Sequence, residues 1–239
     1  MSERFRELHD GGFFVMPNPW DVGSALRLQR LGFVALATTS SGHAWSLGLE
    51  DQQLSFEQVL RHVSDLTAVL DVPLNVDAER LYAATPGEVA DHVAALAEAG
   101  AAGLSIEDYD PGPAAVDDVD VAVERVAAAA QAAGAHGLVL TARAEQHLYG
   151  SDDLDDTIAR LRAYADAGAD VVYAPGLVEP EDIRQVVAEC ERPVNVLLRA
   201  DGPGPADLAA LGVRRASTGG ALARHAYGAM DAAAAELLP

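Results

Sequence analysis

Short apolar runs recur along the chain at intervals of roughly 25 to 40 residues, separated by alanine-rich stretches that predict helices. Most of these runs are aliphatic or β-branched without polar alternation, which is typical of parallel strands that are buried on both faces. Eight strands alternating with helices predict an α/β fold of the (β/α)8 TIM-barrel type, with an open doubly wound sheet as the alternative. The predicted strands cover residues 13–16, 33–37, 73–76, 103–106, 137–140, 170–173, 193–197 and 213–216.

A short phrase repeats where three of the predicted helices end. It reads Leu-Gly-Phe at 31–33 and Ala-Gly-Ala at 99–101 and 167–169. Glycine at this position fits the left-handed conformation that often ends a helix. No linker or low-complexity segment interrupts the pattern, and 239 residues is an ordinary length for one barrel. We therefore expect a single domain that spans residues 1–239.

The composition excludes several kinds of chemistry and partner. All 16 basic residues are arginine, so a Schiff-base aldolase, a pyridoxal-phosphate enzyme and a Walker-type nucleotide site, which all need a lysine, are excluded. With 37 acidic residues and a net charge of −21, the chain is not expected to bind nucleic acid. The sequence contains no apolar run long enough to cross a membrane, so no membrane association is expected.

The N-terminal sequence MSERFRELHD lacks the apolar segment of a secretory signal. Cys190 is the single cysteine and cannot form an internal disulfide, which suits a reducing compartment. We therefore expect a cytoplasmic protein in which Cys190 is a packing residue.

Polar side chains follow the predicted strands at the end where barrel enzymes carry their sites. Asp77 and Glu79 follow the third strand, and Glu107 follows the fourth. Residues at i and i+2 of a strand share a face, so Asp77 and Glu79 are expected to converge. Carboxylate oxygens on neighbouring strands predict a site for Mg²⁺, or Mn²⁺. The alternative for each acidic residue is a solvated loop charge.

Arg143 follows the fifth strand and is the predicted carboxylate clamp, because a guanidinium binds a carboxylate through two parallel hydrogen bonds. Its alternative is a buried ion pair with Glu107 or Glu145. The turn formed by Ser40, Ser41 and Gly42 is expected to offer hydroxyl and backbone N–H groups to a carboxylate or an oxyanion, with a plain turn as the alternative. For His43, which follows this turn, the alternatives are an acid–base role and a structural one.

These phrases, taken in order over nearly the whole chain, resemble the isocitrate lyase and phosphoenolpyruvate mutase superfamily. The matching phrases are Pro-Asn-Pro-Trp-Asp at 17–21, Thr-Thr-Ser-Ser-Gly at 38–42, Ser-Leu-Gly-Leu-Glu-Asp at 46–51, Val-Asp-Ala-Glu at 76–79, Ser-Ile-Glu-Asp at 105–108, Thr-Ala-Arg at 141–143, Pro-Gly-Leu at 175–177 and Pro-Val-Asn-Val-Leu at 193–197.

The resemblance implies a barrel that binds Mg²⁺ and a small 2-oxo acid or its enolate. It implies that Asp77 contacts the metal, while Asp51, Glu79 and Glu107 act directly or through water. The implied catalytic residues are Ser40, Asp77, Glu107 and Arg143. The implied substrate-binding residues are Trp20, Ser40, Ser41, Gly42, Arg143 and Asn195. The family also commonly forms oligomers in which the last helix packs on a neighbour, so a homodimer or homotetramer is expected.

Three departures from the superfamily pattern limit what the resemblance implies. The Lys-x-Cys-Gly-His loop of isocitrate and methylisocitrate lyases is replaced at 109–115 by Tyr-Asp-Pro-Gly-Pro-Ala-Ala. Arg80 and Leu81 stand where relatives usually have a glycine-rich phrase, and Glu145 stands near Arg143 where relatives often have aspartate.

These observations predict an enzyme, namely a Mg²⁺-dependent carbon–carbon lyase or decarboxylase. Its substrate would be a small 2-oxo or 2-hydroxy carboxylate that reacts through an enolate. One alternative is a phosphonopyruvate-type mutase or hydrolase. The other is a non-catalytic member that binds a carboxylate.

Overall fold

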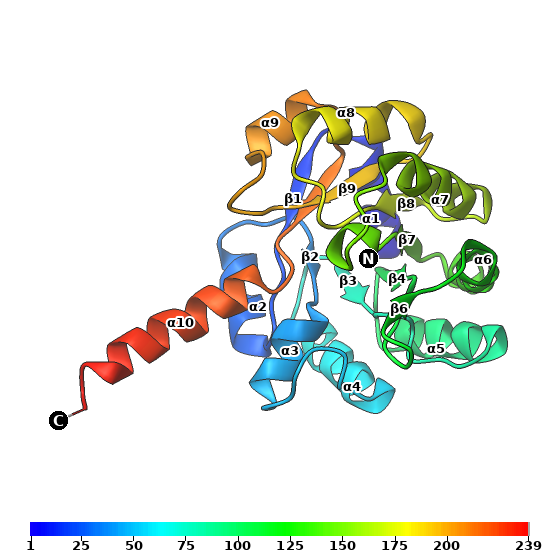
Figure 1. Ribbon diagram of the computed structural model, residues 1–239. Helices are drawn as coiled ribbons and strands as arrows, with labels where there is room; N and C mark the ends of the chain where they lie inside the picture. Colours follow the sequence, from blue (N-terminus) through cyan, green and yellow to red (C-terminus); the bar gives the residue numbers. More distant parts are fainter. Residues whose placement is uncertain (239) are drawn as a thin grey trace.

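In the computed structural model, which describes residues 1–238, eight parallel strands form one sheet that curls into a nearly closed barrel (Figure 1). The strand order is β1-β10-β9-β8-β7-β4-β3-β2. All eight predicted strands are present, and the predicted (β/α)8 fold is confirmed. The strands are β1 (Phe14–Met16), β2 (Leu36–Ala37), β3 (Leu74–Asp77), β4 (Gly103–Glu107), β7 (Val139–Arg143), β8 (Val171–Tyr173), β9 (Val194–Leu197) and β10 (Arg215–Ser217).

The seam between β1 and β2 is joined by short contacts rather than by a full ladder. The N–H of Ala37 donates to the carbonyl of Pro17 at 3.1 Å. The Asn18 side chain donates to the Thr38 carbonyl at 2.6 Å and accepts from the N–H of Thr218 at 2.8 Å. One amide side chain therefore ties three strand ends together at the seam.

Helices cover the outside of the barrel, and their ends follow local sequence signals. Asp21, Ser55 and Thr85 cap α2, α4 and α5 through capping boxes, which satisfy free N–H groups of a helix's first turn. The glycines predicted to end three helices, at positions 32, 100 and 168, have φ values of 96°, 93° and 109°. The covering helices are α2 (Val22–Arg30), α4 (Phe56–Thr67), α5 (Pro86–Glu98), α6 (Val119–His136), α7 (Leu154–Asp166), α8 (Pro180–Glu189) and α9 (Pro205–Ala210).

Helix α1 (Ser2–Asp10) plugs the barrel with the ring of Phe5, which is fully buried among residues of the inner strand faces. Gly103 of β4 makes room for that ring, because a Cβ atom there would lie 2.7 Å from Phe5 Cε1. The amino end of the barrel is therefore closed by apolar packing, and the opposite end is left for the site.

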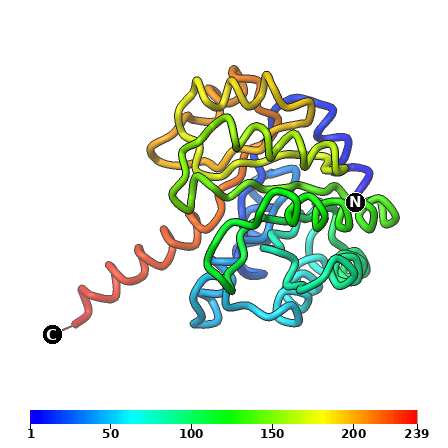
Figure 2. The backbone as a smooth tube through the Cα atoms, turned by 45° about the vertical axis from the view of Figure 1, so that its right-hand side comes forward, coloured from blue at the N-terminus to red at the C-terminus, as the bar shows by residue number. Residues whose placement is uncertain are grey.

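The remaining elements follow the carboxyl ends of the strands, apart from the last helix. They are α3 (Ser40–Ser46), the short helix η1 (Gln146–Leu148) and a hairpin made of β5 (Tyr109–Asp110) and β6 (Ala115–Val116). Helix α10 (Ala221–Ala235) projects away from the barrel (Figure 2), and among its described residues only Ala223 is buried.

Two expectations concern the chain as a whole, namely that it is one domain and that it does not associate with a membrane. The expected domain of residues 1–239 extends one residue beyond the described part. Within that part, no helix combines the length and the apolar character needed to cross a membrane.

Candidate active site

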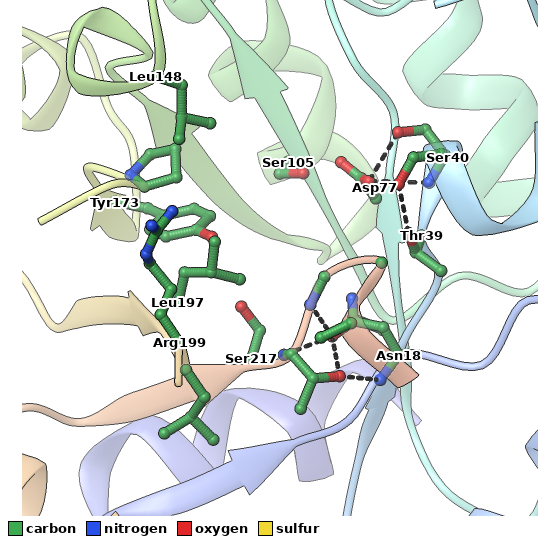
Figure 3. Close-up of a pocket in the computed structure, with 18 of the residues that line it drawn as sticks. Asn18, Thr39, Ser40, Asp77, Ser105, Leu148, Tyr173, Leu197, Arg199 and Ser217 are labelled. Atoms are coloured by element: carbon green, nitrogen blue, oxygen red, sulfur yellow. Dashed lines mark hydrogen bonds between the residues drawn. The ribbon is translucent and has the colours of Figure 1, made fainter. Parts of the chain in front are cut away.

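A cavity of about 900 Å³ opens at the carboxyl ends of the barrel strands (Figure 3). It brings together most of the predicted site residues, although they are far apart in the sequence. Those that line it are Ser40, Ser41, Asp51, Asp77, Glu107, Arg143 and Asn195. Trp20, Gly42 and Glu79 are not among its lining residues.

Arg143 stands at the centre of the acidic side chains. Its Nη1 lies 2.6 Å from Asp77 Oδ1 and 3.1 Å from Glu107 Oε2, and its Nε donates to Glu145 Oε1 at 2.7 Å. The β4–β7 register places Glu107 opposite Arg143. The ion pair that the sequence left open is therefore present, and it involves three carboxylates rather than one.

Ser40 holds the other oxygen of Asp77. Both its backbone N–H and its hydroxyl donate to Asp77 Oδ2 at 2.9 Å. The segment predicted as a turn is the start of helix α3, in which the N–H of Gly42 donates to the Thr39 hydroxyl. The N–H groups of Ser40 and Gly42 are thus engaged within the protein. What these residues present to the cavity is the hydroxyl side of Ser40 and Ser41.

Gly42 and Trp20 pack against neighbouring side chains and do not line this cavity. A Cβ atom on Gly42 would lie 2.6 Å from Thr39 Cγ2, 3.1 Å from Trp20 Cβ and 3.2 Å from Ala223 Cβ. Trp20 packs toward Tyr227 of α10, with ring centroids 6.2 Å apart. Glycine is therefore needed at position 42 because α3 lies close against α10.

Glu79 lies beyond the end of β3, so strand alternation does not set its position relative to Asp77. Strand β3 ends at Asp77, and Glu79 has a φ of 46°, so the two-residue period no longer applies. Glu79 is 4% exposed and lines a neighbouring cavity of about 640 Å³. Within the described residues its Oε1 has no hydrogen-bond partner. Burial, together with the charges of Asp77 and Asp51, raises its pKa to about 8.

Gln52 separates the two cavities and lines both. Its Nε2 donates to Glu107 Oε1 at 2.9 Å, whereas its Oε1 is buried without a partner among the described residues. Burial raises the pKa of Glu107 well above its usual value, although Arg143 opposes the shift. Burial also raises the pKa of Glu145, to about 7. Arg143 is therefore paired with three carboxylates, of Asp77, Glu107 and Glu145, at once.

No three Asp, Glu, His or Cys side chains in residues 1–238 are arranged as ligands around one point. The predicted metal ligands Asp51, Asp77 and Glu107 do line one cavity, with Arg143 between two of them. The Mg²⁺ or Mn²⁺ site stays a prediction.

Arg215 is a residue of the cavity floor that the sequence analysis did not identify. It is 1% exposed, and it donates to Asn195 Oδ1 at 2.9 Å and to Thr141 Oγ1 at 2.8 Å. Asn195 in turn donates to Ser217 Oγ at 3.0 Å, so its amide is engaged at both ends. The signal was available, because Arg215 and Ser217 are two residues apart on one strand and share its inner face.

The rim of the cavity carries aromatic contacts that were also missed. Tyr149 lines the cavity next to Leu148, and its ring stacks on Tyr109 of the β5–β6 hairpin, with centroids 3.7 Å apart and planes at 5°. His43 does not line the cavity and stacks on His62 instead, with centroids 3.7 Å apart. The hairpin that replaces the lyase loop therefore contacts the rim through a tyrosine pair.

Comparisons with known proteins agree with this geometry. The family model described as phosphoenolpyruvate phosphomutase matches residues 5–238. A solved structure from Burkholderia cenocepacia J2315, whose description as a lyase or mutase is provisional, is 48% identical. It superposes with a TM-score of 0.95, covering 99% of this chain and 87% of that one.

Two curated relatives have named activities. The oxaloacetate decarboxylase of Paraburkholderia xenovorans (strain LB400) is 31% identical over 90% of this chain and 75% of its own length. The 2-methylisocitrate lyase of Escherichia coli (strain K12) is 32% identical over 76% of this chain and 64% of its own length. The chain belongs to the phosphoenolpyruvate phosphomutase family, within the isocitrate lyase and phosphoenolpyruvate mutase superfamily.

Proposed function

We propose that the protein is a divalent-metal-dependent carbon–carbon lyase or decarboxylase that acts on a small 2-oxo or 2-hydroxy carboxylate. The observation that carries this proposal is the position of Arg143 in the cavity. Its Nε and Nη1 are held by Asp77, Glu107 and Glu145, whereas its Nη2 has no hydrogen-bond partner among the described residues. One donor of a fixed guanidinium is thus left for a ligand carboxylate.

The orientation of that donor is set from two sides. The three carboxylates hold Nε and Nη1 of the guanidinium, and its Cζ lies over the ring of Tyr173, 5.4 Å from the ring centroid. A group fixed before the ligand arrives loses little entropy on binding, which favours tight and oriented binding of the carboxylate. The Ser40 hydroxyl, which now donates to Asp77, is the nearby group able to exchange that contact for a substrate oxygen.

The residues present fit a hard divalent cation in their chemistry. Asp51, Asp77 and Glu107 supply carboxylate oxygens in the cavity, and the buried, unpartnered Oε1 of Glu79 lies among like charges that raise its pKa. Oxygen ligands of this kind hold Mg²⁺ or Mn²⁺. Asp51, Asp77 and Glu107 would hold the ion, with Glu79 acting through water from the neighbouring cavity, and the ion would stabilise negative charge on an enolate oxygen.

The relatives support cleavage beside a carboxylate. Both named relatives act on carboxylates, as their names state, one as a lyase and one as a decarboxylase. The hairpin of residues 109–116 contains no lysine, cysteine or histidine. The chemistry left to this chain is therefore charge stabilisation by Arg143 and the proposed cation, rather than proton donation by a loop cysteine.

Two measurements test the proposal. Mg²⁺ should raise the melting temperature of the wild type and leave Asp77→Asn unchanged, with Asp91→Asn, an exposed acid of α5, as the matched control. Oxaloacetate with Mg²⁺ should yield pyruvate above the uncatalysed rate, and phosphonopyruvate should not react. Turnover in the presence of excess chelator would contradict the metal mechanism, and turnover of phosphonopyruvate alone would favour the phosphorus–carbon alternative.

We further propose that the protein is a cytoplasmic homo-oligomer assembled through α10. Met230 of α10 and Leu237 and Leu238, which follow its end, are 58%, 85% and 74% exposed in the single chain, which leaves apolar side chains uncovered. Light scattering during size-exclusion chromatography should give a dimer or tetramer, and a chain ending at residue 220 should be a monomer.

A further inference from the structure

Two of the departures from the superfamily pattern contact each other in the structure. Arg80 follows β3, and Asp117 follows the hairpin that replaces the lyase loop. Arg80 donates from Nε to Asp117 Oδ2 at 2.8 Å and from Nη2 to Asp117 Oδ1 at 3.1 Å. Its Nη2 also lies 3.4 Å from Asp110 Oδ2. We call residues 109–116 the lid hairpin. Arg80, in the β3–α5 loop, therefore contacts Asp110 within the lid hairpin and Asp117 directly after it.

This ion pair is sheltered from solvent. The Arg80 and Asp117 side chains are 17% and 10% exposed, and the pair has the two-bond geometry that gives an arginine its strongest contacts. Exposed pairs on this protein, such as Arg61 with Glu57 on α4, lack both properties, since they are 69% and 82% exposed and share one contact. The Arg80 pair is therefore expected to hold its elements together, unlike most surface pairs.

The loop that carries Arg80 is itself fixed. Arg125 of α6, which is buried, donates from Nη2 to the carbonyls of Arg80 at 2.7 Å and Ala83 at 2.9 Å. Leu81 and Tyr82 adopt φ values of 62° and 52°, in a region that residues with side chains rarely occupy. The burial of Leu81 and the Arg125 contacts hold this backbone in place, so Arg80 acts from a rigid support.

The lid hairpin is held at two further points. Arg160 of α7 donates to the Asp117 carbonyl at 2.9 Å, and the N–H of Asp117 donates to the Asp108 carbonyl at 2.7 Å. Tyr109, at the start of the lid hairpin, stacks on Tyr149, which lines the main cavity. The Arg80 pair therefore lies on a connected path from the β3–α5 loop to the cavity rim.

We infer that Arg80 is a positioning residue that keeps the lid hairpin closed against the rim of the active-site cavity. The guanidinium of Arg80 lies outside the lid hairpin, and residues 109–116 themselves include no basic side chain. Loss of the pair releases the lid hairpin, frees Tyr149 from its stacking partner and opens the rim. That Arg80 holds the lid hairpin closed does not depend on the proposed function. That an opened lid hairpin lets a bound ligand leave faster rests on the proposed function.

The test uses the full-length protein with Arg80→Met and Asp117→Asn, which remove the pair from opposite sides. Chymotrypsin cleavage after Tyr109 should be slow in the wild type and at least tenfold faster in both variants. In 1 M NaCl, cleavage of the wild type should stay slow, because salt screens a sheltered ion pair much less than an exposed one. Arg80→Lys, which keeps the charge without the planar geometry, should give an intermediate rate. Arg61→Met is the matched control and should behave as the wild type.

Oxalate supplies the second readout, because it imitates a 2-oxo acid enolate. Its dissociation rate, measured by stopped flow, should rise about tenfold in Arg80→Met, with the association rate changed much less. Equal cleavage rates in the wild type and both variants would overturn the inference. Faster cleavage with an unchanged oxalate dissociation rate would remove the link to the site. Oxalate that fails to bind the wild type would contradict the proposed function and leave the cleavage result to decide the lid hairpin alone.

Discussion

Two arginines point into the same barrel and meet opposite surroundings. Arg143 lies among Asp77, Glu107 and Glu145, whereas Arg215 makes its contacts with neutral acceptors. Burial would lower the pKa of Arg143, but the three carboxylates hold it well above its usual value. Burial lowers the pKa of Arg215 to about 9. Both arginines line the cavity, but the first is paired with carboxylates and the second with neutral partners.

Histidine makes the lower arrangement possible. His9 of α1 has its Nδ1 2.8 Å from the Phe5 carbonyl, which places the proton on Nδ1 and leaves Nε2 to accept from Arg215 Nη1 at 3.1 Å. Burial, then the charge of Arg215, lowers the pKa of His9 to about 3. Arg215 is thus paired with a neutral imidazole, whereas Arg143 is paired with carboxylates. The difference shows that a buried arginine is informative about function only through its partners.

Replacement of Arg143 should have the largest effect. Arg143→Met removes the proposed substrate contact and the only arginine paired with the three carboxylates, so kcat/KM should fall by about 10²–10³-fold. Arg143→Lys should recover little, because a lysine cannot reproduce the planar contacts. Steady-state kinetics with oxaloacetate checks this. Activity within a few fold of the wild type would contradict the role of Arg143.

The acidic layer should make stability depend on pH with an unusual sign. Because the pKa of Glu79 is raised to about 8 in the folded protein, its carboxyl group stays protonated while the unfolded chain ionises near its model value of 4.5. Stability should therefore fall as the pH rises from about 4.5 to 8. In metal-free protein, Glu79→Gln should reduce that fall, to which Glu107 and Glu145 still contribute, and should stabilise the protein at pH 8 by about 4 kcal/mol.

Urea unfolding at several pH values measures this effect. Glu57→Gln, an exposed acid, is the control and should retain the wild-type pH dependence. A wild type that gains stability between pH 4.5 and 8, with Glu79→Gln unchanged, would show that Glu79 ionises freely.

Replacement of Arg215 should separate stability from catalysis. Arg215→Met leaves Asn195, Thr141 and His9 without their donor but strands no carboxylate, so it should cost about 1–3 kcal/mol of unfolding free energy. The kcat should change less than fivefold, because the floor arginine does not face the reacting carboxylate. Urea unfolding and kinetics on one preparation check both parts. A loss of activity comparable to that of Arg143→Met would erase the distinction between the two arginines.

The smallest effect should come from His9. Its lowered pKa means that its contribution to stability is complete above the unfolded value of 6.5 and declines as the pH falls from 6.5 toward 3. Nitrogen NMR of labelled histidine should show a neutral ring protonated on Nδ1 at pH 5. His9→Gln, which can still accept from Arg215, should cost no more than about 1 kcal/mol. A ring that charges near pH 6.5 would place a second cation beside Arg215 and contradict this assignment.

The pattern of apolar runs predicted all eight strands, because buried parallel strands leave a continuous apolar signal. The same pattern predicted that Asp77, Glu107 and Arg143 lie at one end of the barrel, where the strand register places Glu107 opposite Arg143. The position of Glu79 could not be predicted from strand alternation, because the strand ends two residues before it and a left-handed φ cannot be foreseen for glutamate. The spacing of Arg215 and Ser217 could have placed Arg215 on the inner face, but its partners Asn195, Thr141 and His9 come from other elements and could not be predicted.

Gly42 lies where α3, which carries Ser40, packs against Ala223 at the start of α10. A partner that held α10 would therefore also fix the helix whose first residue grips Asp77. Ligand binding and subunit assembly would then be coupled by one coupling free energy. A bound ligand would strengthen assembly, and assembly would strengthen ligand binding by the same factor. In such an enzyme, dilution below the dissociation constant of the oligomer would weaken ligand binding, although no side chain of the site had changed.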